Sequence, residues 1–264
     1  MCVAHLYEAE LFVGIQQSGA GVEGDLFTYS VKAGMGNKAV NYVIFWDAAR
    51  FTNWLTNGQG SGDTESGMYN LGGVTNPTNG SVTRQLDFSA GQNGVAVASE
   101  DEWYKAAYYQ PVGAGGDTDS YWLYPTSSNA TPSNDLVGTD PGNNANFYQA
   151  GYTVGAPTYL TDVGEFENSA SYYGTFDQGG HVREWNDAIV SSEYRGLRGG
   201  AFDTSDSHLQ SSNRYNSSPT LESNFLGFRV SSLAPIPEPS TYAAIFGCLA
   251  LTVATMRRNG RRTL

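Results

Sequence analysis

The stretch YGTFDQGGHVREW, residues 173–185, decides how the second half of this chain is interpreted. Its Gly179-Gly180 pair predicts a tight turn, because glycine adopts backbone conformations that are closed to other residues. Val182–Trp185 follows this turn and predicts a short strand. Two further short strands are predicted at Tyr194–Arg198 and Gly227–Ser231. We therefore expect short elements joined by long connections in this half.

The first half contains the clearest helix signal. Four apolar side chains recur at i, i+4, i+7 and i+11, which places them on one face of a helix over residues 44–57. They are Ile44, Ala48, Phe51 and Leu55. Asn57-Gly58 supplies a stop signal at the C-terminal end, whereas the N-terminal end has no clear capping residue.

A second helix is predicted over residues 100–109, because Ser99 and Glu102 have the spacing of a capping box. Residues 27–31 predict a strand, and residues 79–87 predict a hairpin. Residues 111–160 form a long polar region with few apolar islands. An irregular stretch of this length is usually held by bound ions or functional contacts.

Composition narrows the class of protein. The chain has 264 residues with 32 glycines, 13% aromatic and only 15% charged residues, which indicates a loop-rich globular fold. Its formal net charge of −12 argues against nucleic acid as a partner, because phosphates are bound by basic patches. Cys2 and Cys248 are the only cysteines, so the sequence predicts neither a disulfide framework nor a thiol-rich metal site.

The C-terminal tail carries a separate signal. Pro237, Glu238 and Pro239 precede an apolar run over 240–256, and four arginines follow it. This order predicts a transmembrane helix over 240–256 with its basic end in the cytoplasm; a buried helix is the alternative. The tail resembles the PEP-CTERM sorting signal. That resemblance implies an exosortase-type sorting protease and the membrane as partners, and an exported protein that is membrane-anchored and then released to the cell surface or beyond.

Several motifs, taken in order, resemble the formylglycine-generating enzyme, or sulfatase-modifying factor, family. The segment 173–185 is similar to the family's "GLYDMxGNVWEW", and Glu100–Trp103 with Ala106-Ala107 is similar to "EAEWEYAAR". The remaining matches are Val40–Val43, Trp46–Ala49 and Asn53–Leu55 to the first helix, Leu197–Gly200 to "LRGGS", and Gly227–Val230 to "GFRV".

The resemblance implies an α+β fold related to C-type lectins, with few helices, a small twisted antiparallel sheet and much irregular loop. We expect this domain over 27–231, preceded by an irregular start over 1–26 and followed by the sorting tail over 232–264. The family's usual opening strand and helix have no counterpart here, and the N-terminus does not read as a signal peptide. We therefore expect the chain to begin inside the domain.

Catalysis in this family depends on two cysteines between "RGGS" and "GFR" that bind copper. Residues 201–226 contain no cysteine, so we expect no copper and no formylglycine chemistry. A second catalytic branch uses non-haem iron bound by histidines. His5, His181 and His208 are scattered without that spacing. The prediction leans toward a non-catalytic module; a formylglycine-generating oxidase, or another metal-dependent enzyme of the family, is the alternative.

The resemblance also implies structural calcium. Its ligand positions correspond to the side chains of Asp177 and Glu184 and to the carbonyls of Gly180 and Val182, a set of hard oxygen donors that suits Ca²⁺. Alternatively, Asp177 forms a turn and Glu184 pairs with Arg183 or Arg195.

A second family calcium site corresponds to Asn146 and Phe147. The functional prediction is thus an exported surface or matrix protein. Its domain would bind calcium, and its ligand would be a polysaccharide or a surface protein.

Overall fold

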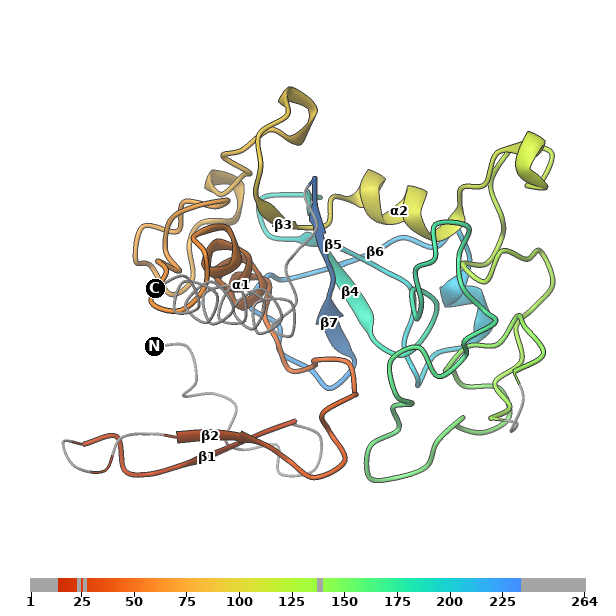
Figure 1. Ribbon diagram of the computed structural model, residues 1–264, viewed down its shortest axis with the longest axis horizontal. Coiled ribbons are helices and arrows are strands. Elements are labelled where there is room, and N and C mark those ends of the chain that lie inside the picture. The colour runs from red at the N-terminus through yellow and green to blue at the C-terminus, as the bar shows by residue number, and fades with distance from the viewer. Residues whose placement is uncertain (1–13, 23–24, 26–27, 137–139, 234–264) are drawn as a thin grey trace, which may run out of the picture.

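The computed structural model describes residues 14–22, 25, 28–136 and 140–233. Its largest sheet has four strands in the order β6-β5-β4-β7 (Figure 1). These are β4 (Arg183–Ile189), β5 (Arg195–Arg198), β6 (Tyr215–Ser217) and β7 (Leu226–Phe228). The strand predicted at 182–185 is thereby confirmed as the start of β4, and the strand predicted at 194–198 as β5.

The sheet is mixed, which corrects the predicted antiparallel sheet. β4 pairs antiparallel with β5 but parallel with β7, where Glu184 lies opposite Gly227. A parallel pair needs a long connection between its strands, and residues 190–225 supply it. The predicted strand at 227–231 is divided between β7 and β8 (Val230–Ser232), which pairs with β3 (Val95–Val97) in a second small sheet.

A third, two-stranded sheet lies at one end of the molecule (Figure 1). It consists of β1 (Ile15–Ser18) and β2 (Thr28–Val31), which pair antiparallel. The strand predicted at 27–31 corresponds to β2. The region 1–26, predicted to be irregular, contains β1.

Both predicted helices are confirmed. α1 (Phe45–Thr56) has no side-chain cap at its N-terminus, and α2 (Glu100–Tyr108) begins with the predicted capping box of Ser99 and Glu102. Short 3-10 helices cover Asn79–Ser81, Phe88–Ala90, Val112–Ala114 and Asp206–Leu209. The hairpin predicted over 79–87 is wrong, because a 3-10 turn and an isolated bridge between Tyr69 and Arg84 occupy this segment.

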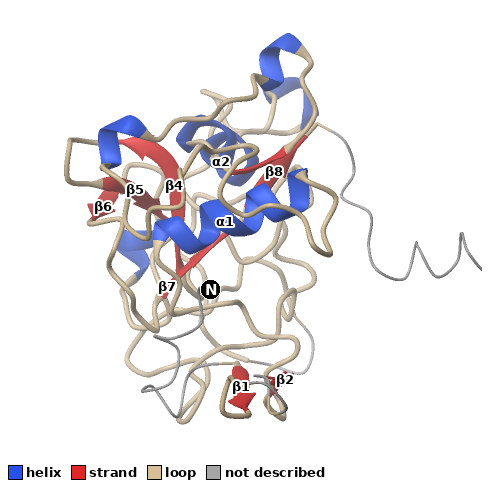
Figure 2. Ribbon diagram, turned by 90° about the vertical axis from the view of Figure 1, so that its left-hand side faces the viewer, coloured by secondary structure: helices blue, strands red, loops and turns tan. Residues whose placement is uncertain are grey.

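The main core lies between α1 and the large sheet (Figure 2). Phe45 and Trp46 of α1 and Trp185 of β4 are fully buried there, with their rings packed edge to face. Apolar burial contributes about 25 cal/mol per Å², so such large rings dominate the stabilisation of this core. The long region after α2 is mostly loop, as predicted, and forms a lobe beside the sheet (Figure 1).

The predicted transmembrane helix requires a correction. Within the described part of the chain, no helix is long and apolar enough to cross a bilayer. The segment 240–256 and the motif Pro237–Pro239 lie outside the described residues. A C-terminal membrane anchor is therefore not supported, and the fold class and localisation that included it are corrected. Recognition of the motif by a sorting protease stays a prediction.

Candidate functional site

The predicted calcium segment is held in an unusual backbone conformation. Asp177 and Gly180 have positive φ angles of 59° and 79°. A Cβ on Gly180 would lie 2.2 Å from the Asn146 carbonyl oxygen, so only glycine fits there. This close approach lets the His181 amide donate to the Asn146 carbonyl at 2.7 Å. The structure thus brings the two predicted calcium sites side by side.

Glu184 lies at the centre of a charged contact. The residue is 5% exposed. Its carboxylate accepts hydrogen bonds from both Nε and Nη2 of Arg229, the second at 2.7 Å. The indole Nε1 of Trp103 donates to the same carboxylate at 2.5 Å. The partner is therefore neither Arg183 nor Arg195. A calcium ion bound by Glu184 would have to share this carboxylate with a guanidinium, so the donor set fits calcium poorly at this position.

Asp177 accepts from the amide of Gly164 at 2.7 Å and lines a cavity of about 10 Å³ together with Asn144 and Ser169. Burial lowers the pKa of His181, although Asp177 and Glu184 act in the opposite direction. The two predicted side-chain ligands thus both influence the neighbouring imidazole. His181 is 1% exposed. Its Nε2 lies 3.0 Å from the Thr161 carbonyl oxygen, within hydrogen-bond distance.

The second predicted site fits an oxygen-seeking cation better. Asn146 is 2% exposed; its Nδ2 donates to the Tyr159 carbonyl at 3.0 Å, while its Oδ1 has no hydrogen-bond partner. A buried oxygen without a partner is costly unless something coordinates it. The carbonyl of Phe147, the other predicted position, accepts from Asn134 at 3.0 Å. An unpartnered amide oxygen is a hard donor of the kind that Ca²⁺ prefers, so Asn146 Oδ1 fits calcium chemistry.

The segment between Gly200 and Gly227 is fixed by ordinary packing. Leu209 is fully buried, and its carbonyl accepts from the Tyr108 hydroxyl at 3.0 Å. Asp206 accepts from the Tyr124 hydroxyl at 3.0 Å. Its side chains are therefore tied to the loop lobe. Among residues 14–22, 25, 28–136 and 140–233, no cluster of three or more His, Cys, Asp or Glu side chains could hold a metal.

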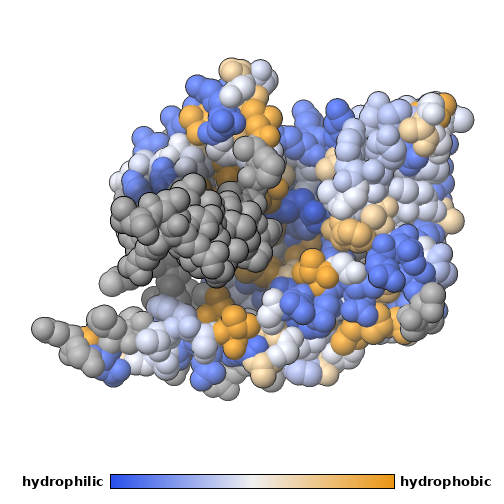
Figure 3. All heavy atoms as spheres, in the orientation of Figure 1, coloured by the Kyte–Doolittle hydropathy of each residue, from blue (hydrophilic) through white to orange (hydrophobic). Residues whose placement is uncertain are grey.

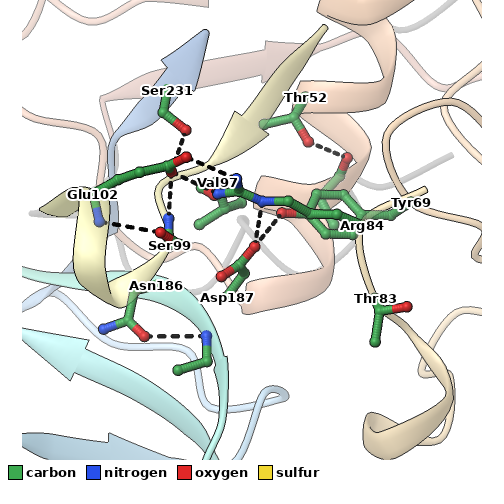
Figure 4. A network of polar contacts seen from close by, with 12 residues as sticks. Thr52, Tyr69, Thr83, Arg84, Val97, Ser99, Glu102, Asn186, Asp187 and Ser231 are labelled. Atoms are coloured by element: carbon green, nitrogen blue, oxygen red, sulfur yellow. Dashed lines mark hydrogen bonds and ion pairs between the residues drawn. The ribbon is translucent and has the colours of Figure 1, made fainter. Parts of the chain in front are cut away.

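A polar network that sequence reasoning missed surrounds Arg84 (Figure 4). Its two Nη atoms donate to the Glu102 carboxylate at 2.9 and 2.8 Å, and its Nε lies 2.5 Å from Asp187. The capping-box residue Glu102 also accepts from Ser231 at 2.7 Å. The network thus joins α2 to β4 through the Arg84 guanidinium and to β8 through the Glu102 carboxylate. Only the Ser99–Glu102 spacing signalled any part of it in the sequence.

The network shifts the ionisation of both carboxylates. Burial alone would raise the pKa of Glu102, but hydrogen bonds from Arg84, the Ser99 amide and Ser231 outweigh it and lower the pKa to about 2. Burial raises the pKa of Asp187, against the opposing effect of Arg84. The network therefore stabilises contacts between elements, and its groups have partners within the domain.

Hydrophobic side chains are scattered among hydrophilic ones on the face shown in Figure 3. The described residues that are visible on that face therefore form no single broad apolar patch of the kind that marks a docking surface.

The mixed sheet, the two helices, the long loop lobe and the ordered motifs define a loop-rich α+β domain of the formylglycine-generating type. The chain belongs to the family described as "Sulfatase-modifying factor enzyme 1-like domain", whose model matches residues 19–233. This confirms the family resemblance drawn from the motifs. A search of curated proteins gives no match.

Three solved structures are similar to this chain, all at low sequence identity. CarF is 18% identical, with a TM-score of 0.48 over 77% of this chain and 70% of CarF. Variable protein 1 of Treponema denticola is 19% identical, with a TM-score of 0.41 over 76% and 73%. PvdO of Pseudomonas aeruginosa is 18% identical, with a TM-score of 0.43 over 87% and 74%.

Proposed function

We propose that this domain is a non-catalytic recognition module built on the sulfatase-modifying-factor scaffold. The observation that carries the proposal is the composition of residues 201–226, which contain no cysteine. In the resemblance drawn above, this is where catalytic relatives hold copper through two thiolates. Serine, threonine and leucine side chains cannot replace a thiolate as a soft ligand and redox centre.

The packing of this segment supports the same proposal. Leu209 fills a buried cluster with Tyr124, Ala145 and Phe147. Thr204 forms hydrogen bonds with the amide and the carbonyl of Ala201, at 2.9 and 3.0 Å. These side chains stabilise the loop lobe. The proposed ligand is a polysaccharide or a protein.

Structural calcium at Asn146 is part of the proposal. Its unpartnered Oδ1 would be a ligand, and calcium would add a cross-link between the loop lobe and the segment 177–184. At Glu184 the guanidinium of Arg229 already supplies the neutralising charge, so we place the ion at Asn146 instead.

The direct test is turnover. The purified domain is incubated with a cysteine-containing sulfatase peptide, copper and oxygen, and the peptide is examined by mass spectrometry. A catalytically active family member serves as the positive control. We expect no formylglycine from this domain. Formylglycine above the level of a no-protein control would overturn the recognition module in favour of the oxidase.

A further inference from the structure

A pocket of about 400 Å³ lies at the N-terminal end of α1, where Trp46 is the one residue of the family motifs that lines it. Its lining comes from four segments: the start of α1 with Trp46, the loop 76–79, the β4–β5 turn at 192–194, and the β6–β7 connection at 218–220. A volume of this size lies within the range of small-ligand sites, about 300–1,000 Å³.

The pocket walls are held in place by hydrogen bonds. Asn79, 5% exposed, donates from Nδ2 to the carbonyls of Ser191 and Tyr194, at 3.1 and 3.2 Å. The amide of Phe45 donates to the carbonyl of Pro219 at 3.0 Å, which fixes the β6–β7 connection to α1. A pocket formed by fixed walls needs little ordering when a ligand binds, which favours affinity.

One buried lining group, the Trp46 indole, points to a ligand, and the Arg195 guanidinium lies against its ring, 5.6 Å from the centroid. Trp46 is fully buried and lines the pocket, and its indole Nε1 has no hydrogen-bond partner. Behind it lies the guanidinium of Arg195, 4.3 Å from the Phe45 ring centroid and bonded to Asn79 at 2.5 Å. An unpaired buried N–H costs about 1–3 kcal/mol, so a ligand oxygen that accepts from it gains binding energy.

The lining combines hydroxyl, amide and flat apolar groups. Ser218 and Thr220 supply hydroxyls, while Tyr194 and Pro77 supply apolar faces. Glu193 is the only titratable acid in the lining, and no cation pairs with it in the part of the chain that the structure describes. A carboxylate accepts from neighbouring hydroxyls of a neutral sugar and repels an anionic ligand.

We propose that this pocket binds one residue of a neutral saccharide, with its C–H face against Tyr194 and Pro77 and its hydroxyls toward Glu193, Ser218 and the Trp46 N–H. The inference rests on the proposed recognition function and names the ligand class and the site. Tyrosine gives a ligand a large amphipathic contact surface, which suits a ring that is apolar on its faces and polar at its edge.

The test measures binding of methyl glucoside, methyl galactoside, methyl mannoside and glucuronate to the full chain by ligand-observed NMR. Ser192→Trp fills the pocket from an exposed turn, and Glu193→Gln removes the charge with little change of shape. Glu167→Gln makes the same chemical change at an exposed position outside the pocket and is the matched control. Thermal unfolding checks that each variant is folded.

We expect at least one neutral glycoside to bind. Ser192→Trp should abolish this binding, Glu193→Gln should weaken it about tenfold because a charge-assisted hydrogen bond is lost, and Glu167→Gln should leave it unchanged. Undiminished binding to folded Ser192→Trp, binding of glucuronate alone, or no binding at all would each overturn the pocket proposal. None of these results involves turnover, so the recognition module itself would fail only in the formylglycine assay.

Discussion

Two arginines, the partly buried Arg84 and the fully buried Arg195, show how differently this domain compensates a positive charge. Arg84 faces two carboxylates, Glu102 and Asp187, at distances between 2.5 and 2.9 Å. Arg195, with no exposed surface, donates instead to neutral oxygens of Asn79, Val82 and Asp187 and stacks on Phe45. Burial lowers the pKa of Arg195 to about 10.

The difference separates a region that stabilises the fold from the region that we propose for recognition. The guanidinium of Arg84 contacts carboxylates from α2 and β4, which compensate its charge directly, and Glu102 extends the contact to Ser231 of β8. The guanidinium of Arg195 lies behind the wall of the open pocket, and neutral acceptors leave more of its charge uncompensated. Such a desolvated charge costs free energy in the unliganded domain, which is typical of residues that position a binding site.

The largest expected effect comes from removing the Arg84 guanidinium. Arg84→Met leaves the carboxylate of Asp187, whose side chain is 14% exposed, without its cation, and loss of one partner of a largely desolvated pair costs about 3 kcal/mol, the lower end of the range for buried pairs. We expect the free energy of unfolding, measured in urea, to fall by that amount. Arg84→Lys keeps the charge but loses the planar fork of the guanidinium, so its free energy of unfolding should lie between those of the unmodified chain and Arg84→Met. A loss below about 1 kcal/mol for Arg84→Met would contradict the structural role, because exposed pairs lie in that range.

The next effect separates charge from geometry at Arg195. Arg195→Lys keeps a cation near the pocket but cannot reach Asn79 and Val82 together, because only a guanidinium has the planar fork. We expect the free energy of unfolding to fall by about 2 kcal/mol. Binding of the neutral glycoside should weaken by more than it does in the Arg84→Lys variant. The exposed substitution Arg214→Lys is the control. Unchanged binding in folded Arg195→Lys would show that Arg195 does not hold the pocket in shape.

The pH dependence of stability tests the charged contact between Arg84 and Glu102. The pKa of Glu102 is lowered in the folded state from 4.5 to about 2, so its stabilisation is present above pH 4.5 and is lost as the pH falls toward 2. Glu102→Gln should therefore lower the unfolding free energy by about 1–2 kcal/mol at pH 7, after a discount for the partial exposure of this side chain. The difference in unfolding free energy between Glu102→Gln and the unmodified chain should shrink as the pH falls from 4.5 to 2. A difference independent of pH would show that packing, and not the ionised carboxylate, is responsible.

The smallest expected effect concerns calcium at Asn146, a buried side chain whose Oδ1 has no hydrogen-bond partner. Saturating calcium should raise the midpoint of thermal unfolding by about 2–4 °C, as a gain of about 1 kcal/mol does for a domain of this size. EDTA should reverse the shift, and Asn146→Ala should remove it. Asn144→Ala is the matched control, since Asn144 also has a buried, unpartnered Oδ1 but was not predicted as a ligand. An equal calcium shift in folded Asn146→Ala would place the ion elsewhere.

The sequence predicted those elements whose signals are local. The apolar spacing of α1 and the Ser99–Glu102 box of α2 lie within single segments, and both helices are where they were expected. The hairpin over 79–87 was wrong because Arg84 anchors that segment to Glu102 and to the Val97 carbonyl, contacts that no local pattern reveals.

Long-range pairing explains the other differences. The parallel pair β4–β7 joins segments about 40 residues apart, and the partner of Glu184 is Arg229, which directly follows β7. The pocket was not predicted because its walls come from four separated segments. By contrast, the family was recognisable because its motifs are short and occur in order.

The central claim is that the pocket region recognises a ligand, whereas the Arg84 region only stabilises the fold. One NMR titration tests it most directly, in which the ¹⁵N-labelled chain is titrated with the neutral glycoside that was found to bind. The Nε1–H signal of Trp46, assigned through Trp46→Phe, and the Nε–H signal of Arg84 are followed together. We predict a saturable shift of the Trp46 signal and none of the Arg84 signal. A stationary Trp46 signal under saturating glycoside, or a larger shift at Arg84, would contradict the account.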